Sequence, residues 1–250
     1  MIHIDTLSKT FSGGKGLDRV SLHIKPGEMV ALIGSSGSGK STLMRHIAGL
    51  MPGDADGGRI EVAQHLIQDR GVISRDIRTM RAEIGMVFQQ FNLVDRMSVL
   101  RNVMLGALSR TALWRSLLGF FHEEDARLAY KALARVGIME KAHQRTSNLS
   151  GGQRQAMALL MSTMTPIDFL ILDEHTAALD PKTADLIMEL TDKIVKQKNL
   201  TTIMVTHNLR YAVEYGNRLL MMHQGEAVMD LSAKEKQELK VEDILEKFNA

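Results

Sequence analysis

Gly34-Ser35-Ser36-Gly37-Ser38-Gly39-Lys40-Ser41, followed by Thr42, is the stretch that decides the fold of this 250-residue chain. The apolar run Met29–Ile33 precedes it and predicts a buried strand, and apolar residues recur every three or four positions after Lys40, as in a helix. Strand, glycine-rich loop and helix are in the order that lets backbone N–H groups and a helix N-terminus converge on phosphate groups. We expect Lys40 to neutralise phosphate charge and the Ser41 hydroxyl to ligate Mg²⁺.

Two carboxylates end a second predicted strand. Asp173 and Glu174 directly follow the apolar run Phe169–Leu172, and ligands bind at this edge of parallel sheets. Asp173 suits a Mg²⁺ partner acting through water, and Glu174 suits the base that orients or deprotonates an attacking water. His207 comes just after the next predicted strand, Thr201–Val205, where it could contact the terminal phosphate.

Two further side chains are candidates for the nucleotide site. Gln89 follows the predicted strand Ile84–Phe88, where its amide oxygen can reach the metal or the metal's water. Phe11 lies beside the glycine-rich segment Ser12–Gly16 and could stack on adenine, although a single phenylalanine is more often part of a core.

A second phosphate site is predicted at Leu149-Ser150-Gly151-Gly152-Gln153, which precedes an apolar helix. The segment supplies a hydroxyl, exposed backbone amides and the positive end of a helix dipole. Because the chain already carries one phosphate loop, we expect this half-site to serve the nucleotide held by another copy. The expected working unit is a homodimer with ATP at a symmetric interface.

Together these residues resemble the ATP-binding cassette family over essentially the whole chain. The resemblance implies an α/β fold of the P-loop NTPase type, with a parallel core sheet, a small N-terminal antiparallel β part and an inserted α-helical lobe. It implies ATP and Mg²⁺ as cofactors and ATP hydrolysis coupled to transport. The family motifs fall on Phe11 (adenine stacking), Gly34 to Thr42 (Walker A), Gln89 (Q-loop), Leu149 to Gln153 (signature), Asp173 and Glu174 (Walker B and catalytic acid), Ala178-Leu179-Asp180 (D-loop) and His207 (switch histidine).

One cassette domain over residues 1–250 fits the chain length. We expect a nucleotide-binding core at 1–92 and 163–230, a helical lobe with the signature at 93–162, and a C-terminal helix at 231–250. Within the core, Ile2–Leu7 and Val20–Ile24 predict a hairpin-like pair of strands. Asp185–Lys198 predicts an amphipathic helix. Its expected inward residues are Leu186, Ile187, Leu190 and Ile194.

Composition limits the partners. Lys and Arg number 31 against 29 Asp and Glu, a balance that does not favour nucleic acid. There is no cysteine, and the longest apolar runs are far shorter than the roughly 20 residues that cross a bilayer. The first residues lack a basic segment followed by an apolar run, so we expect no signal peptide. We therefore expect no direct membrane insertion. The resemblance implies a peripheral subunit on the cytoplasmic face of the membrane, bound to transmembrane permease subunits that work with a solute-binding protein.

A finer resemblance divides the chain. From Leu43 to Gln153 it resembles the ATP-binding subunits of phosphonate importers, in Arg75-Asp76-Ile77-Arg78, Phe88 to Val94, Gly106-Ala107-Leu108 and Trp114-Arg115. Beyond the signature, Ala156 and Met161 replace two usual arginines, and His175 replaces a usual proline. The segment Asp173 to Pro181 resembles a different group of bacterial importers. A natural mosaic and a chimera joined near the signature helix are both open hypotheses.

The main hypothesis is the ATPase subunit of an importer, possibly of phosphonate type. Two alternatives stay open, namely a soluble cassette protein in a lyase complex of phosphonate metabolism, and an engineered or mosaic nucleotide-binding scaffold with weak turnover. Apolar residues of the helical lobe bear on the choice, since they could meet a transmembrane subunit or belong to the core. They are Trp114, Leu117, Leu118, Phe120 and Phe121.

Overall fold

A computed structural model describes residues 1–112, 114, 115, 120–238, 242 and 244 of the protein. The chain divides into two compact units. The first unit contains Met1–Ile84, Asp168–Glu174 and Asp192–Ala250, and the second contains Gly85–Ile167 and His175–Thr191. Of the predicted C-terminal helix at 231–250, Leu231 ends a strand and α9 (Ala233–Gln237) is helical, while most residues after 238 lie outside the described part.

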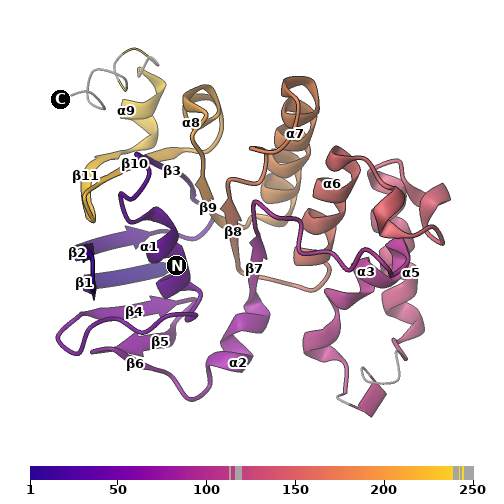
Figure 1. The fold of residues 1–250 in the computed structure, drawn as a ribbon, viewed down its shortest axis with the longest axis horizontal. Helices are drawn as coiled ribbons and strands as arrows, with labels where there is room; N and C mark the ends of the chain where they lie inside the picture. Colours follow the sequence, from indigo (N-terminus) through magenta and orange to yellow (C-terminus); the bar gives the residue numbers. More distant parts are fainter. Residues whose placement is uncertain (113, 116–119, 239–241, 243, 245–250) are drawn as a thin grey trace. The chain divides into compact units, whose positions relative to one another are not determined.

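The core of the first unit is a parallel sheet. Its strands are β3 (Met29–Gly34), β8 (Phe169–Asp173), β9 (Thr201–Val205), β10 (Arg218–His223) and β11 (Glu226–Leu231). They lie in the order β11-β10-β3-β9-β8 (Figure 1). All neighbours run parallel except β11, which pairs antiparallel with β10. Every residue of β3 and β9 is buried, because strands covered on both faces need uninterrupted apolar runs. The predicted parallel core sheet is confirmed.

A second, antiparallel sheet is built from the N-terminal part of the chain. Its strands are β1 (Ile2–Phe11), β2 (Gly14–Ile24), β4 (Arg59–Val62), β5 (His65–Asp69) and β6 (Val72–Ile73), in the order β2-β1-β4-β5-β6. Residues at the start of β1 alternate between buried and exposed, as in a sheet with one solvated face. The predicted hairpin is confirmed, with longer strands. Helix α1 (Lys40–Ile47) contacts β2, β3 and β4 and so joins the two sheets.

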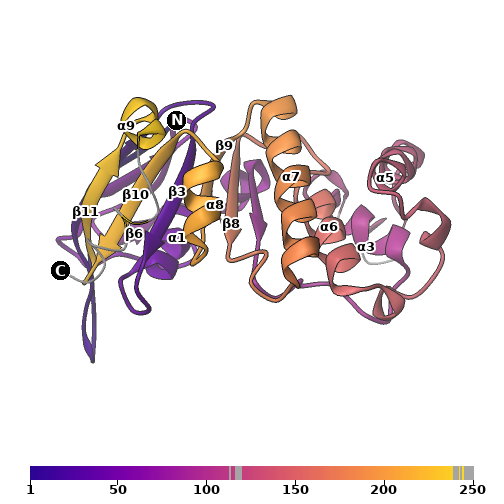
Figure 2. The same cartoon turned by 90° about the horizontal axis from the view of Figure 1, so that it is seen from above.

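Three short helices complete the first unit. Helix α2 (Ile77–Met80) contacts β5. Helix α8 (Leu209–Glu214) contacts β3, and α9 contacts β10 and β11 (Figure 2). In α9, Lys236 is buried and its ammonium donates to the carbonyls of Tyr215 and Gly216. Burial lowers the pKa of Lys236 to about 8. These bonds fasten α9 to the turn that precedes β10.

The second unit is mainly helical. Strand β7 (Ile84–Val87) leads into it, followed by α3 (Val99–Leu105), α5 (Glu123–Arg135) and α6 (Gly151–Ser162). The three helices pack on one another around a shared apolar core, visible as a cluster in Figure 1. That core includes Val103, Leu133 and Met157, none of which is exposed. The predicted inserted helical lobe is confirmed as an element of the fold.

For helix α7 (Pro181–Lys198), the sequence prediction of the inward-facing residues is wrong at one position. Leu186 is 58% exposed, whereas Ile187 is 5% exposed as expected. The fully buried positions are 184, 187, 188, 191 and 195, a spacing of three and four residues. Leu186 stands about 100° away from Ile187 around the helix axis and therefore faces outward. Among the described residues, no helix has the length and apolar character to cross a membrane.

An ion pair between the buried Asp125 and the partly exposed Arg110 lies at the N-terminus of α5. The Asp125 carboxylate is 1% exposed, and one of its oxygens accepts a hydrogen bond from the Arg110 guanidinium. The other oxygen has no partner among the described residues. A carboxylate removed from water depends strongly on its cation, since an unpaired buried charge costs several kcal/mol.

We therefore expect Arg110→Met to destabilise the second unit by about 3 kcal/mol. The single tryptophan of the chain, Trp114, lies in this unit, so urea unfolding followed by its fluorescence measures the effect. Arg127→Met is the matched control, because its ion pair with Glu123 is largely exposed and contributes little. Equal stability of the two variants would contradict a structural role for the Arg110–Asp125 pair.

Candidate nucleotide site

Tight packing at two glycines shapes the loop between β3 and α1. Gly39, the N-cap of α1, has φ +102°, a conformation that side chains rarely adopt. A Cβ atom there would lie 2.5 Å from the carbonyl oxygen of Gly16, and one at Gly34 would lie 2.3 Å from that of Met222. Only glycine fits at either point. The loop backbone can therefore turn its N–H groups toward one focus at the N-terminus of α1.

Lys40 is held inside this loop. Its ammonium donates to the carbonyl oxygens of Gly34 and Ser35, each at 2.9 Å, and the side chain is 5% exposed. Burial lowers the pKa of Lys40, and the carboxylates of Glu174 and Asp173 oppose this shift. The lysine thus closes the loop and supplies positive charge at its centre.

The loop forms one wall of a polar pocket of about 370 Å³. Glu174, His207 and Phe11 line the same pocket, so these sequence-predicted residues do come together in the first unit. The lining residues are Phe11, Gly13, Gly14, Lys15, Gly16, Ser36, Gly37, Ser38, Gly39, Lys40, Ser41, Thr42, Glu174 and His207. Phe11 is 41% exposed, so its ring is available for stacking.

The sequence prediction missed one wall of this pocket. The turn of the β1–β2 hairpin contributes Gly13 to Gly16, and Lys15 is paired there with Asp18 at 2.5 Å. The glycine-rich composition of Ser12–Gly16 was visible in the sequence and could have pointed to a close backbone approach. The hairpin turn and the phosphate loop line the same pocket although they are distant in sequence, and local sequence patterns do not reveal such a contact.

Glu174 and His207 form a hydrogen-bonded pair at the pocket edge. Nε2 of His207 lies 2.6 Å from Oε1 of Glu174. The backbone of Glu174 has φ +48°, and its N–H donates to the carbonyl oxygen of Val205 at 3.1 Å. A non-glycine residue in the left-handed region is strained, and such strain concentrates at functional sites. Both the backbone and the side-chain carboxylate of Glu174 are therefore held in place.

Asp173, at the end of β8, has a different environment. Burial, and then the charge of Glu174, raise the pKa of Asp173. Arg45 and Lys40 partly offset this rise. Two adjacent carboxylates with the Lys40 ammonium nearby leave net negative charge that a hard divalent cation would neutralise. The site is thus chemically suited to Mg²⁺.

His175, the residue after Glu174, belongs to the second unit and is 3% exposed. Its Nε2 lies 3.2 Å from the hydroxyl oxygen of Thr191 on α7, and that hydroxyl donates to the carbonyl of Ile187. Since the Thr191 hydrogen is used, His175 is the donor in this contact. Burial lowers the pKa of His175 to about 4. The imidazole is therefore neutral near pH 7 and serves as a packed, hydrogen-bonded anchor.

The segment Leu149–Gln153 begins helix α6 of the second unit. Ser150 is its N-cap, and Ser150 and Gln153 form a reciprocal capping box with distances of 3.3 Å and 3.2 Å. A Cβ atom at Gly152 would lie 2.3 Å from a methyl carbon of Thr183, so a side chain there would require Thr183 to move. The exposed hydroxyl of Ser150 and the first amides of α6 provide the donors of an anion site.

The remaining predicted residues also lie in the second unit. Gln89 follows β7 and is exposed. Asp180 precedes α7 and accepts a hydrogen bond from the Thr183 N–H at 3.1 Å. Hydrogen bonds from the side chain and then the backbone of Thr183 lower the pKa of Asp180. Of the apolar residues singled out in the predicted helical lobe, Trp114 is 62% and Phe120 58% exposed, whereas Phe121 packs against the core of the unit. Leu117 and Leu118 lie outside the described residues.

Comparisons with known proteins agree with this geometry. The family described as "ABC transporter" matches residues 17–177. The phosphonates import ATP-binding protein PhnC of Shigella sonnei is 43% identical over 236 residues, covering 94% of this chain and 90% of that protein. The protein of the same name from Stutzerimonas stutzeri is 47% identical over 225 residues, covering 90% and 82%.

A solved structure shows the same fold. The dimeric, post-hydrolysis state of the ATP-binding cassette MJ0796 bound to ADP and Pi matches with a TM-score of 0.78 at 29% identity, covering 93% of this chain and 99% of that one. The P-loop NTPase fold expected from the sequence is thereby confirmed. With the phosphate loop, the two strand-end carboxylates and the signature all in place, the chain belongs to the ABC transporter family of ATP-hydrolysing cassettes.

Proposed function

We propose that this chain is the ATPase subunit of a phosphonate-type importer and that it hydrolyses Mg-ATP at the pocket between the phosphate loop and the Glu174–His207 pair. The chain is an importer ATPase by family and by its relatives. The 2.6 Å contact between His207 and Glu174 carries the proposal, because it fixes a base and a phosphate-sensing donor beside Lys40.

The first step is binding of the triphosphate. Amides of Ser36 to Thr42 surround the β- and γ-phosphates, and the N-terminus of α1 adds its positive potential. Lys40 would exchange a carbonyl contact within the loop for a phosphate oxygen. Phe11, exposed at the end of β1, would stack on the adenine ring.

Mg²⁺ fits two oxygen donors of the first unit, the Ser41 hydroxyl and Asp173 acting through water, and Gln89 as a further ligand stays a prediction from the sequence. When bound, the ion would neutralise charge on the β- and γ-phosphate oxygens. Burial, and then the neighbouring Glu174 carboxylate, raise the pKa of Asp173, and a nearby cation would favour the charged form of Asp173.

The hydrolytic step uses Glu174 and His207. Glu174 accepts a proton from, or orients, the attacking water in line with the γ-phosphate. Nε2 of His207, which contacts Glu174 in this structure, would exchange that contact for the γ-phosphate and would respond when the phosphate leaves. Lys40 and the signature amides stabilise charge on the transferring phosphoryl group.

The second half of each site would come from another copy of the chain. Leu149 to Gln153 offer the Ser150 hydroxyl and the α6 N-terminus, while Asp180 would line the same interface. A symmetric dimer with two nucleotides satisfies both copies at once. The dimeric MJ0796 cassette supports this arrangement.

The phosphonate class is inferred from the relatives, which are named as phosphonate import proteins. Importer ATPases work with membrane-embedded permease subunits, and we infer a peripheral place on the cytoplasmic face together with a solute-binding protein outside. Exposed Trp114 and Phe120 support a docking surface in the second unit. The named relatives favour this assignment over the lyase-complex alternative.

The catalytic role of Glu174 is testable by Glu174→Gln. We expect ATP binding to be retained, turnover to fall by roughly 10²- to 10⁴-fold, and an ATP-bound dimer to accumulate on size-exclusion chromatography. Exposed Glu189 on α7 gives the matched control, Glu189→Gln. An unchanged hydrolysis rate in Glu174→Gln protein would sink the assignment, and a normal rate in the wild-type chain would remove the weak-turnover alternative.

Solute class and docking can be tested with the reconstituted transporter. We expect alkylphosphonates, delivered by the binding protein, to raise the ATPase rate above that seen with amino acids.

Trp114→Ser combined with Phe120→Ser should abolish this stimulation but preserve turnover of the isolated subunit. Met139→Ser, which changes another exposed apolar residue of the second unit, is the control. Stimulation by amino acids alone, or full stimulation in the double variant, would contradict the respective proposal.

A further inference from the structure

Arg154 makes two contacts that together bridge parts of the second unit. It directly follows the signature segment, on helix α6. Its Nε donates to the carbonyl oxygen of Leu149 at 3.2 Å. Its guanidinium carbon lies 5.5 Å from the centre of the Phe91 ring. Phe91 stands only two residues after Gln89, so one side chain touches both the signature and the chain that follows Gln89.

The far end of that chain is held separately, by a buried amide. Asn102 of α3 is 0% exposed, and its Oδ1 accepts from the Val94 N–H at 2.8 Å. Its Nδ2 donates to the Val94 carbonyl at 2.9 Å and to the Thr146 hydroxyl oxygen at 2.8 Å. Residues 94–98 are thereby tied to the residues just before the signature.

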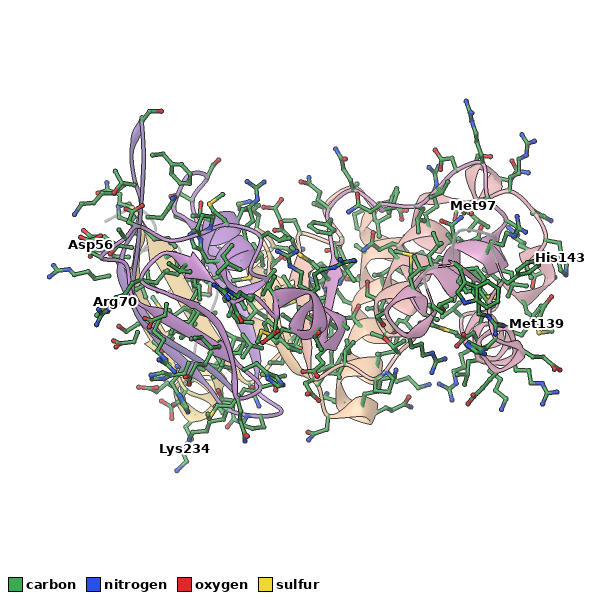
Figure 3. The ribbon with its side chains drawn as sticks, turned by 90° about the horizontal axis from the view of Figure 1, so that it is seen from below. Asp56, Arg70, Met97, Met139, His143 and Lys234 are labelled. Carbon is green, nitrogen blue, oxygen red and sulfur yellow. The ribbon has the colours of Figure 1, made fainter. Side chains whose placement is uncertain are left out.

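Backbone pairing strengthens this end. The N–H and the hydroxyl of Thr146 both donate to the carbonyl of Met97, at 3.0 and 3.2 Å, and Met97 is labelled in Figure 3. The Ser147 N–H donates to the carbonyl of Asp95, and Ser98 and Arg145 form an isolated bridge. Several hydrogen bonds and a bridge therefore join the segment 94–98 to the segment 145–147.

The contacts that hold the two ends of the segment 91–98 thus differ in strength. The Asn102 end is buried and held by several hydrogen bonds, whereas Phe91 and Arg154 are both half-buried and meet through a ring contact. A single contact of this kind is weak enough to open and close. Leu93 also packs against the apolar core of the unit, but Arg154 is the side chain that contacts both Phe91 and the signature segment directly.

We propose that Arg154 is a positioning residue that couples the Gln89 loop to the signature serine, by clasping Phe91 while holding the Leu149 carbonyl. The proposal rests on the function proposed above, together with the sequence prediction that Gln89 contacts the metal of the bound nucleotide and that Ser150 meets the nucleotide of the partner copy. A displacement of Gln89 would then reach Ser150 through Phe91, Arg154 and Leu149.

A double-mutant cycle of Arg154→Gln and Phe91→Leu tests the proposal in the full-length chain. We expect each single variant to lower kcat for ATP roughly threefold to tenfold, as suits one partly buried cation–π contact. The double variant should lose no more than the worse single variant. Phe91→Tyr, which keeps an aromatic ring, should restore turnover. Affinity of the monomer for ATP should stay within about twofold of wild type, because the pocket residues lie in the first unit.

Arg127→Gln supplies the matched control, as it removes another arginine of the same unit from an exposed ion pair. Unchanged kcat in Arg154→Gln, additive losses in the double variant, or an equal loss in Arg127→Gln would each overturn the proposal. The cycle is measured alongside Glu174→Gln. Failure of the proposed function appears as persistent turnover in Glu174→Gln protein, whereas failure of the Arg154 proposal appears only within the cycle.

Discussion

The hydrogen bonds from Lys40 to the carbonyls of Gly34 and Ser35 set the constraint on which the rest of the site depends. They close the loop over a buried ammonium. The closed loop needs glycine at Gly39, which lies against the Gly16 carbonyl, and at Gly34, which lies against the Met222 carbonyl. The parallel sheet carries β3, β8 and β9 to the same edge, so Glu174 and His207 end beside that loop. The fold thus brings the phosphate loop, the positive charge of Lys40 and the carboxylate of the proposed base, Glu174, into one pocket.

The same constraint leaves the site chemically incomplete. The pocket supplies donors on the side of the phosphate loop, but the signature donors at Ser150 belong to the other unit of the chain. In the proposed symmetric dimer, each copy would lend its signature to the other's nucleotide. The strain at Glu174 and the neutral, buried His175 that follows it fit a base fixed before substrate arrives.

Individual site residues could be predicted from the sequence because each motif is local. A strand, a glycine loop and a helix identify Lys40, and a strand end identifies Glu174. Their relations could not be predicted in the same way. The hydrogen bond between Glu174 and His207, the hairpin turn at Gly13–Gly16 and the Arg154–Phe91 contact all join residues far apart in sequence. Leu186 was misplaced because apolar character alone does not fix the phase of a helix. The mosaic origin of the segment after the signature stays a hypothesis.

The central claim, that each active site is shared between two copies, is tested most directly by complementation. Lys40→Ala chains lack a working phosphate loop, and Ser150→Arg chains lack a working signature, so each alone should be inactive. In an equal mixture, the heterodimer has one intact site formed by opposite halves. We predict that the mixture regains roughly a quarter of wild-type turnover, as half the dimers carry one of two sites. A mixture as inactive as its components, or an active Ser150→Arg protein, would contradict the account.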